Sequence, residues 1–137
     1  MSEMFSPMMI SAHGMKVQGE RTRIISENIA NASTAPLTPD GKPYTRKLIT
    51  FKNALDKETG LNLVQVNEIT EDKKSDYNLK YMPDHPAANK SGYVKMPNVQ
   101  MIVELNDMRE AQRSYEANLG MLDQSKTMMM RAINLLE

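Results

Sequence analysis

The sequence contains no cysteine, no tryptophan and no long apolar run. The missing cysteine excludes a disulfide framework, thiol catalysis and cysteine-ligated metal sites. No apolar stretch approaches the roughly 18 residues that crossing a bilayer requires, so we expect no direct membrane span. Residues 1–15 have neither a basic leader nor a continuous apolar core. We therefore expect no cleaved signal peptide.

An excess of charge of one sign is missing too. The chain has 17 basic and 17 acidic residues, so its formal net charge is zero, and the two signs are close to balance in every segment. Proteins that bind nucleic acid present a basic surface that neutralises phosphates. Since no segment supplies such a surface, we expect no nucleic acid among the partners.

Catalytic patterns are equally scarce. The two histidines, His13 and His85, lie in different segments, and neither has a second histidine or a carboxylate at ligand spacing. The sequence has no glycine-rich phosphate loop, no G-x-S-x-G and no H-E-x-x-H. We therefore expect no catalytic residue, no metal and no cofactor, and a protein that is not an enzyme.

The first feature that is present is a helical segment near the N-terminus, predicted for residues 6–31. Ser6 is a suitable N-cap and Pro7 suits the first helical position. Gly14 and Gly19 each weaken the helix by up to about 1 kcal/mol relative to alanine, which indicates either close approach of another segment or simple tolerance. Its apolar residues recur at helical spacing, chiefly Met8, Met15, Ile25 and Ile29.

A longer helix is predicted for residues 99–136, with Asn98 as its cap. Within it, one row with a spacing of seven is large and apolar at every position: Met101, Met108, Tyr115, Leu122, Met129 and Leu136. The row that starts at Glu104 is mostly small. A large row beside a small row indicates a seam for another helix. The alternative, a helix lying on its own β-domain, would need a larger domain than the chain has.

Three asparagines allow two interpretations each. Asn118 lies in the seam, where a buried amide can fix the register of two helices, or it lies at an exposed edge. Asn28 and Asn31 are three residues apart and share a helix face. Their amides either bridge neighbouring subunits, or Asn31 caps the helix end.

Between the helices the pattern changes to a β-rich insert. Six of the seven prolines lie there. Thr, Tyr, Val, Ile and Phe are enriched in four candidate strands: residues 44–51, 61–69, 77–82 and 92–95. Thr38 to Gly41 is a predicted turn in which the glycine has a positive φ. The charged residues 71–76 are expected to form a solvated hairpin tip.

The predicted fold class is therefore α+β. Long N- and C-terminal helices form an antiparallel coiled-coil-like pair, and a small β-domain is inserted between them. The predicted division places the N-terminal helix of the core domain in residues 1–33, the β-rich insert in residues 34–97 and the C-terminal helix in residues 98–137.

Several segments resemble a known family. Residues 26–32, Ser-Glu-Asn-Ile-Ala-Asn-Ala, resemble the N-terminal signature shared by the axial proteins of the bacterial flagellar rod and hook. Residues 92–99, Gly-Tyr-Val-Lys-Met-Pro-Asn-Val, resemble the segment before the C-terminal helix of the proximal rod branch. Residues 114–118 and 126–129 are similar to that helix.

The resemblance implies a structural subunit of the bacterial flagellar basal-body rod, placed in the periplasm. Its implied partners are copies of itself, other rod proteins and the flagellar type III export apparatus, which would export it without a cleaved signal peptide. The resemblance also implies that the terminal helices pack into the proximal drive shaft and into the wall of the export channel.

The expected assembly interface follows the seams. An alternative function is a soluble helical adaptor or chaperone that uses the same seams on a client protein. An enzyme whose site forms only between subunits is a further alternative, disfavoured by the missing nucleophile–base pairs. The expected interface residues are Met8, Met15, Ile25, Asn28, Ile29, Asn31, Met101, Met108, Tyr115, Asn118, Leu122, Met129 and Leu136.

Overall fold

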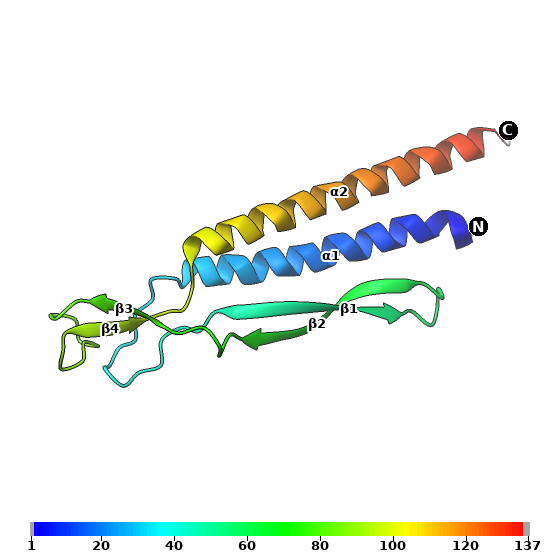
Figure 1. The fold of residues 1–137 in the computed structure, drawn as a ribbon. Helices are drawn as coiled ribbons and strands as arrows, with labels where there is room; N and C mark the ends of the chain where they lie inside the picture. Colours follow the sequence, from blue (N-terminus) through cyan, green and yellow to red (C-terminus); the bar gives the residue numbers. More distant parts are fainter. Residues whose placement is uncertain (1, 136–137) are drawn as a thin grey trace. The chain divides into compact units, whose positions relative to one another are not determined.

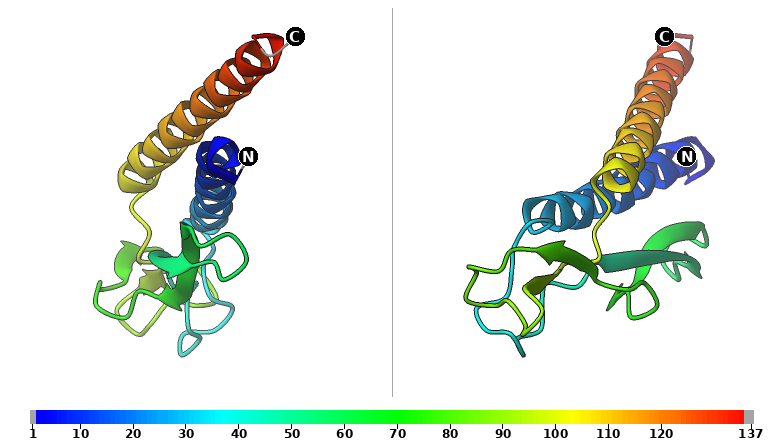
Figure 2. Two further views of the ribbon diagram at one scale, coloured as in Figure 1. Left: turned by 90° about the vertical axis from the view of Figure 1, so that its right-hand side faces the viewer. Right: turned by 60° about the vertical axis from the view of Figure 1, so that its left-hand side comes forward.

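The structure is a computed structural model that describes residues 2–135. Two helices flank four strands along the chain, which confirms the α+β class (Figure 1). Both helices run without a break in the further views (Figure 2). The elements are α1 (Ser2–Ala30), β1 (Lys47–Leu55), β2 (Asn62–Glu71), β3 (Asn78–Tyr81), β4 (Tyr93–Met96) and α2 (Met101–Asn134).

The first helix begins one turn earlier than the sequence predicts. α1 starts at Ser2, so Ser6 is not its N-cap and Pro7 lies inside the helix. Pro7 has no N–H to donate to the carbonyl four residues before it, so the early turn lacks one of its hydrogen bonds. The predicted end is confirmed to within one residue, at Ala30.

The second helix begins later than predicted, because Asn98 does not cap it. α2 starts at Met101, and the N–H groups of Val103 and Glu104 donate to the carbonyl of Gln100 at 3.0 and 3.1 Å. The side chain of Asn98 instead binds backbone groups of other segments. The predicted cap was wrong because that amide serves longer-range contacts.

The strands form two separate two-stranded sheets, β1 with β2 and β3 with β4. In the second sheet the strands are antiparallel, with Tyr81 opposite Tyr93. The solvated hairpin tip predicted at residues 71–76 is wrong, because β2 and β3 belong to different sheets. There Asp72 accepts hydrogen bonds from the N–H groups of Lys74 and Ser75 at 3.0 and 3.2 Å, which turns the chain locally.

The predicted turn at Thr38 to Gly41 is present, and the N–H of Gly41 donates to the carbonyl of Thr38 at 3.0 Å. Its glycine does not have the expected positive φ. Among the described glycines, Gly60 at 69° and Gly92 at 82° do. At Gly41 the reason for glycine is space instead, because a Cβ atom there would lie 3.0 Å from Cβ of Pro36.

The chain divides into two compact units, each with parts of both helices and of the strands. Unit 1 comprises Met1–Thr22, Ile49–Glu68 and Arg109–Glu137, and unit 2 comprises Arg23–Leu48 and Ile69–Met108. Each unit therefore draws on all three segments that the sequence pattern distinguishes.

In unit 1, α1 lies between α2 and the β1–β2 hairpin (Figure 1). Toward α2, Gly14 lies against Asn118, and the guanidinium of Arg21 donates to the carboxylate of Glu110 at 3.3 Å. Toward the hairpin, α1 and β2 share a hollow, and Leu63 of β2 is fully buried. The buried apolar residues of this unit are Val17, Leu63 and Ala111.

Unit 2 has a core in which polar residues are as prominent as apolar ones. Its buried apolar residues are Ile24, Ile25, Ala87, Val94 and Val99. Its buried polar residues are Asn28, Thr45, Asp72, Asn98 and Glu104. Buried polar groups are stable only when they are hydrogen-bonded, so this core has to be a connected network.

The glycines of α1 give the first testable prediction. A Cβ atom at Gly19 would have no neighbour within 4 Å, so Gly19→Ala should raise the free energy of unfolding by up to about 1 kcal/mol. At Gly14 a Cβ atom would lie 2.6 Å from Oδ1 of Asn118. Gly14→Ala should therefore not raise the free energy of unfolding, because the new methyl group displaces the amide of Asn118, which donates to the carbonyl of Ser114.

Urea unfolding of the two variants measures the difference. Adding Asn118→Ala to Gly14→Ala should restore the gain, because it removes the side chain that the new methyl group meets. Equal stabilisation by Gly14→Ala and Gly19→Ala would show that the contact at Gly14 has no energetic weight.

Candidate assembly interface

Exposed large apolar side chains are concentrated on α2. Soluble helices usually bury such residues along one face, and exposed apolar surface marks an interaction site. On α2 these residues extend over the whole helix: Met101, Ile102, Val103, Leu105, Tyr115, Leu119, Met121, Met128, Met130 and Ile133.

The row of α2 that the chain itself covers is the row of small residues. Ala111 is fully buried, Glu104 is 1% exposed, and Asn118, Ser125 and Ala132 are half-buried. In unit 1 this is the row that faces α1, because Asn118 meets Gly14. Small side chains let two helices approach closely, which leaves the large residues at the margins of the contact.

The large row of α2 is covered only in part. Met101 and Tyr115 are 42% and 39% exposed, whereas Met108, Leu122 and Met129 are half-buried. The last member of the predicted row, Leu136, lies outside the described residues. The expected contact residues of α2 therefore have surface left for a further partner.

The expected contact residues of α1 are more deeply covered. Met8 and Met15 are half-buried in unit 1, and Ile29 is half-buried in unit 2. Ile25 is 4% exposed in the core of unit 2. Since α1 is covered in this way, α2 offers more free apolar surface than α1 does.

Asn28 has all of its amide capacity occupied inside unit 2. Its Nδ2 group donates to the carbonyl of Lys47 at 2.9 Å and to the carboxylate of Glu104 at 3.1 Å. Its Oδ1 accepts from the N–H of Lys47 at 2.9 Å and from the hydroxyl of Tyr44 at 2.8 Å. An asparagine amide has two donors and two acceptor sites, so none remains for a neighbouring subunit.

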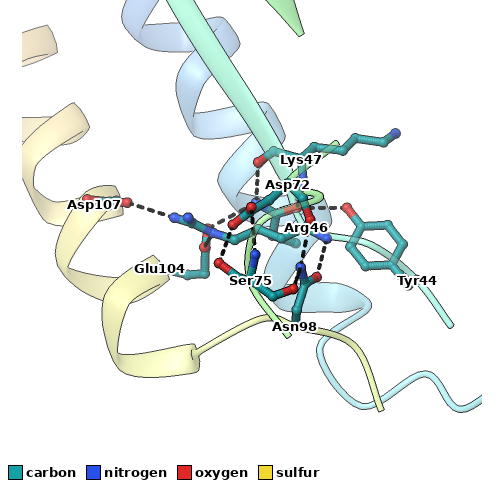
Figure 3. A network of polar contacts seen from close by, with 9 residues as sticks. Tyr44, Arg46, Lys47, Asp72, Ser75, Asn98, Glu104 and Asp107 are labelled. Carbon is teal, nitrogen blue, oxygen red and sulfur yellow. Dashed lines mark hydrogen bonds and ion pairs between the residues drawn. The ribbon is translucent and has the colours of Figure 1, made fainter. Parts of the chain in front are cut away.

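The carboxylate of Glu104 is the most deeply buried charge of this network. The Nε group of Arg46 donates to it, and a second nitrogen of the same guanidinium donates to Asp107 at 3.4 Å. Figure 3 shows Arg46 directed at these two acids, which lie one helical turn apart on α2. Burying a carboxylate is strongly unfavourable unless it is paired, and Glu104 is paired with Arg46 and also accepts a hydrogen bond from Asn28.

Asn98 ties the segment before α2 to Arg46 and to the loop between β2 and β3. Its Oδ1 accepts from the N–H of Arg46 at 2.7 Å, and its Nδ2 group donates to the carbonyls of Asp72 and Ser75 at 2.9 and 3.2 Å (Figure 3). The hydroxyl of Ser75 donates to Asp72 at 2.7 Å and, above all other causes, holds the pKa of that carboxyl below its ordinary value.

Tyr44 remains a hydrogen-bond donor at all ordinary pH values. Burial raises the pKa of its hydroxyl to about 12, and the nearby carboxylates of Glu27 and Glu104 act in the same direction. Glu27 itself forms an ion pair with Lys47. The neutral phenol therefore keeps its bond to Asn28 well above neutral pH.

The other two asparagines have local partners. The amide of Asn31 donates to the carbonyl of Glu27 at 2.9 Å, and its backbone N–H donates to the same oxygen at 3.1 Å. This geometry supports the capping interpretation for Asn31. Asn118 is half-buried against Gly14, which supports the register interpretation rather than an exposed edge.

The sequence pattern did not single out Arg46, Asn98 and Glu104 as partners. One signal was available: Glu104 is the sole charged residue in a heptad row of otherwise small residues. Within residues 2–135, neither helix is both long and apolar enough to span a membrane. The same part of the chain contains no group of three histidine or acidic side chains arranged to hold a metal ion.

The pKa of Tyr44 gives a prediction with a definite sign. A raised phenol pKa means that the folded state favours the neutral form, so its contribution is complete below pH 10.0 and is lost as the pH rises toward about 12. Tyr44→Phe should lower the free energy of unfolding at neutral pH by about 1 kcal/mol, and less so in alkali, because it removes one hydrogen bond.

Urea unfolding of both proteins at neutral and alkaline pH checks this. Tyr81→Phe is the matched control, because Tyr81 is 63% exposed and should alter neither value. A stability difference between the Tyr44→Phe variant and the unaltered chain that stays constant from neutral to alkaline pH would contradict the assignment.

Comparison with known proteins covers the whole of this architecture. Residues 90–135, which include β4 and α2, match the family model described as "Flagellar basal body rod FlgEFG protein C-terminal". The chain is 44% identical over 128 residues to the flagellar basal-body rod protein FlgC of Agrobacterium fabrum, a match that covers 93% of this chain and 91% of that protein.

Two further relatives extend the match. The chain is 38% identical over 152 residues to FlgC of Borreliella burgdorferi, covering 98% of both proteins. It is 33% identical over 146 residues to FlgC of Bacillus subtilis, covering 96% of this chain and 97% of that protein. Similarity of this extent includes both helices and every strand, and on this basis the chain belongs to the family of the flagellar basal-body rod protein FlgC.

Proposed function

We propose that the chain is a structural subunit of the flagellar basal-body rod and that it assembles there through the exposed apolar side chains of α2. Its relatives are named as basal-body rod proteins, so its role is structural and not enzymatic. The observation that carries the proposal for the interface is the exposure of large apolar residues along the whole of α2.

Most of the exposed apolar residues of α2 lie on two flanks of the helix, one on each side of the small row. At 100° per residue, Met121 and Met128 lie on one flank, and Leu105, Tyr115 and Leu119 lie on the other. The row opposite the small row is mixed: Ile102 and Met130 are apolar, and Arg109, Glu116 and Asp123 between them are charged. Two apolar flanks suit a subunit that has a neighbour on either side of α2.

Contacts in unit 1 support an antiparallel, coiled-coil-like arrangement of the two helices. Gly14 meets Asn118, and Arg21, further along α1, pairs with Glu110, which is earlier in α2. In the rod we assign the helix pair to the drive shaft and to the wall of the export channel. Burial of each Leu or Met side chain there would contribute about 1.5–3 kcal/mol.

The residues proposed for contact between subunits are exposed or half-buried in the subunit, except Leu136, which is proposed from its place in the heptad row alone. Ile25 and Asn28 are left out because each is buried in unit 2, and Asn31 because its amide caps α1. Contact would be made with copies of the same chain and with other rod proteins. The proposed set is Met8, Met15, Ile29, Met101, Leu105, Met108, Tyr115, Asn118, Leu119, Met121, Leu122, Met128, Met129, Ile133 and Leu136.

Export and location form a further part of the proposal. We assign the folded subunit to the periplasmic part of the rod, reached through the flagellar type III export apparatus without cleavage of a signal peptide. Burial supports the last point, because Ser11 is 5% and Val17 is 3% exposed in unit 1, so this segment belongs to the folded subunit. A helical adaptor or chaperone finds no support in the FlgC relatives described above.

Charge placed on one flank of α2 tests the interface. Met121→Lys and Met128→Lys change side chains that are 56% and 62% exposed, so the subunit itself should fold as before. Each variant should lower incorporation into isolated basal bodies by about tenfold or more, because a buried apolar contact is lost and a charge is brought into it. Swimming of a complemented deletion strain should fall with it.

Asp123→Lys is the matched control, since the residue is already charged and exposed on the same helix and lies away from both flanks. It should leave swimming and incorporation unchanged, and thermal unfolding of all three purified variants should match that of the unaltered chain. Normal swimming of the Met121→Lys and Met128→Lys strains would exclude this flank from the interface.

A further inference from the structure

Apolar contacts alone do not select one alignment of the two helices. In α2 the large row and the small row both repeat every seven residues. A displacement of α2 by one heptad, about 10.5 Å, therefore places similar side chains against α1 again. A contact that does not share the repeat is needed to distinguish these alignments.

Unit 2 contains such a contact. Asn28 of α1 holds the N–H and the carbonyl of Lys47, and Glu104 of α2 accepts hydrogen bonds from Asn28 and from the side chain of Arg46. Both helices are thereby tied to the same two residues of the chain, Arg46 and Lys47. Glu104 is the only acid of its row, whose later members are Ala111, Asn118, Ser125 and Ala132.

We propose that Asn28, Glu104 and the Arg46–Lys47 segment form a register pin that selects one heptad alignment of α2 against α1. In an alignment shifted by seven residues, Ala111 takes the place of Glu104 beside Asn28. The carboxylate of Glu104 then loses its donors, which makes that alignment strongly unfavourable. Neutral apolar contacts impose no such difference.

Unit 1 gives independent support for a single alignment. Gly14 and Asn118 meet there, in a space that any other residue at position 14 would fill. From Gly14 to Asn28 is fourteen residues along α1, and from Asn118 back to Glu104 is fourteen residues along α2. The steric contact in unit 1 and the polar contact in unit 2 thus specify the same alignment.

The absence of cysteine from the chain allows a direct test with introduced pairs. Gly14→Cys with Asn118→Cys reports the native alignment, because the Cβ position of residue 14 lies 2.8 Å from Cγ of Asn118, the atom whose place the introduced sulfur takes. Gly14→Cys with Ala111→Cys or with Ser125→Cys reports the two alignments shifted by one heptad. The native pair also removes the steric contact, which leaves the pin alone to set the alignment.

With the pin intact, the native pair of the purified full chain should form its disulfide at least about tenfold faster than either shifted pair, the discrimination expected from hydrogen bonds to a charged group. In a Glu104→Ala or Asn28→Ala background this ratio should fall toward one. A residue that merely stabilises the fold would slow all three pairs equally and leave the ratio unchanged. A change in the ratio therefore indicates a role in alignment, whereas equal slowing of all three pairs indicates a role in stability alone.

Two further variants keep the test decisive. Glu110→Ala removes another glutamate of α2 that pairs with an arginine, but its side chain is 66% exposed, so the ratio should stay within about twofold of the original. Glu104→Gln keeps an oxygen for Asn28 and should retain part of the preference even if Glu104→Ala unfolds the chain. A native ratio that persists in folded Asn28→Ala and Glu104→Ala chains would overturn the pin and assign the alignment to the segment anchored by Asn98.

Discussion

The structure of unit 2 depends on keeping one buried carboxylate paired. Glu104 comes from α2, whereas its partners come from α1 and from the segment that enters β1. None of these segments can satisfy its polar groups alone, because Asn28 and Arg46 both donate hydrogen bonds to the carboxylate of Glu104. A buried charge that needs donors from two distant segments tolerates few alternative arrangements. Specificity of the fold in this unit therefore rests more on hydrogen bonds than on the volume of its apolar core.

The distribution of residue types differs from that in an ordinary small domain. Polar side chains such as Asn28 and Glu104 are among the most buried, whereas Met121 and Met128 are mostly exposed. Hydrophobic burial is the largest favourable term in folding, so a chain that leaves many large apolar side chains exposed has limited stability alone. In a rod, neighbouring subunits would supply the missing burial, and stability would become a property of the assembly.

Patterns with a short period were the most predictable part of this molecule. Both helices, the four strands and the α+β class follow from helical or alternating spacing, and the ends of α1 and α2 are displaced by only a few residues. The network around Arg46 could not be derived in this way, because it joins residues that are 52 to 76 positions apart in the sequence. Rules based on neighbouring residues also failed at Asn98, which was expected to cap α2, and at Asp72, which was expected in a hairpin tip. Both residues bind segments that are distant in the sequence.

The sequence predicted which residues of α2 form a contact row, but not which side chains stay exposed on the folded subunit. Heptad spacing identified the large row of α2, yet it could not show that α1 would cover the small row and leave two flanks exposed. Likewise the glycine at position 14 indicated close approach, but spacing alone could not separate it from Gly19, where nothing comes near. Identifying the free surface required knowing which side chains the subunit buries by itself.

The abundance of methionine on α2 bears on how one surface can meet several different neighbours. Methionine is unbranched, and its thioether is readily polarised, so a methionine side chain changes rotamer at little cost to fill contacts of different shape. Met101, Met121, Met128 and Met130 are all exposed along this helix. A structure built from several kinds of subunit presents environments that are similar without being identical. A deformable surface lets the same polypeptide occupy such quasi-equivalent positions without refolding.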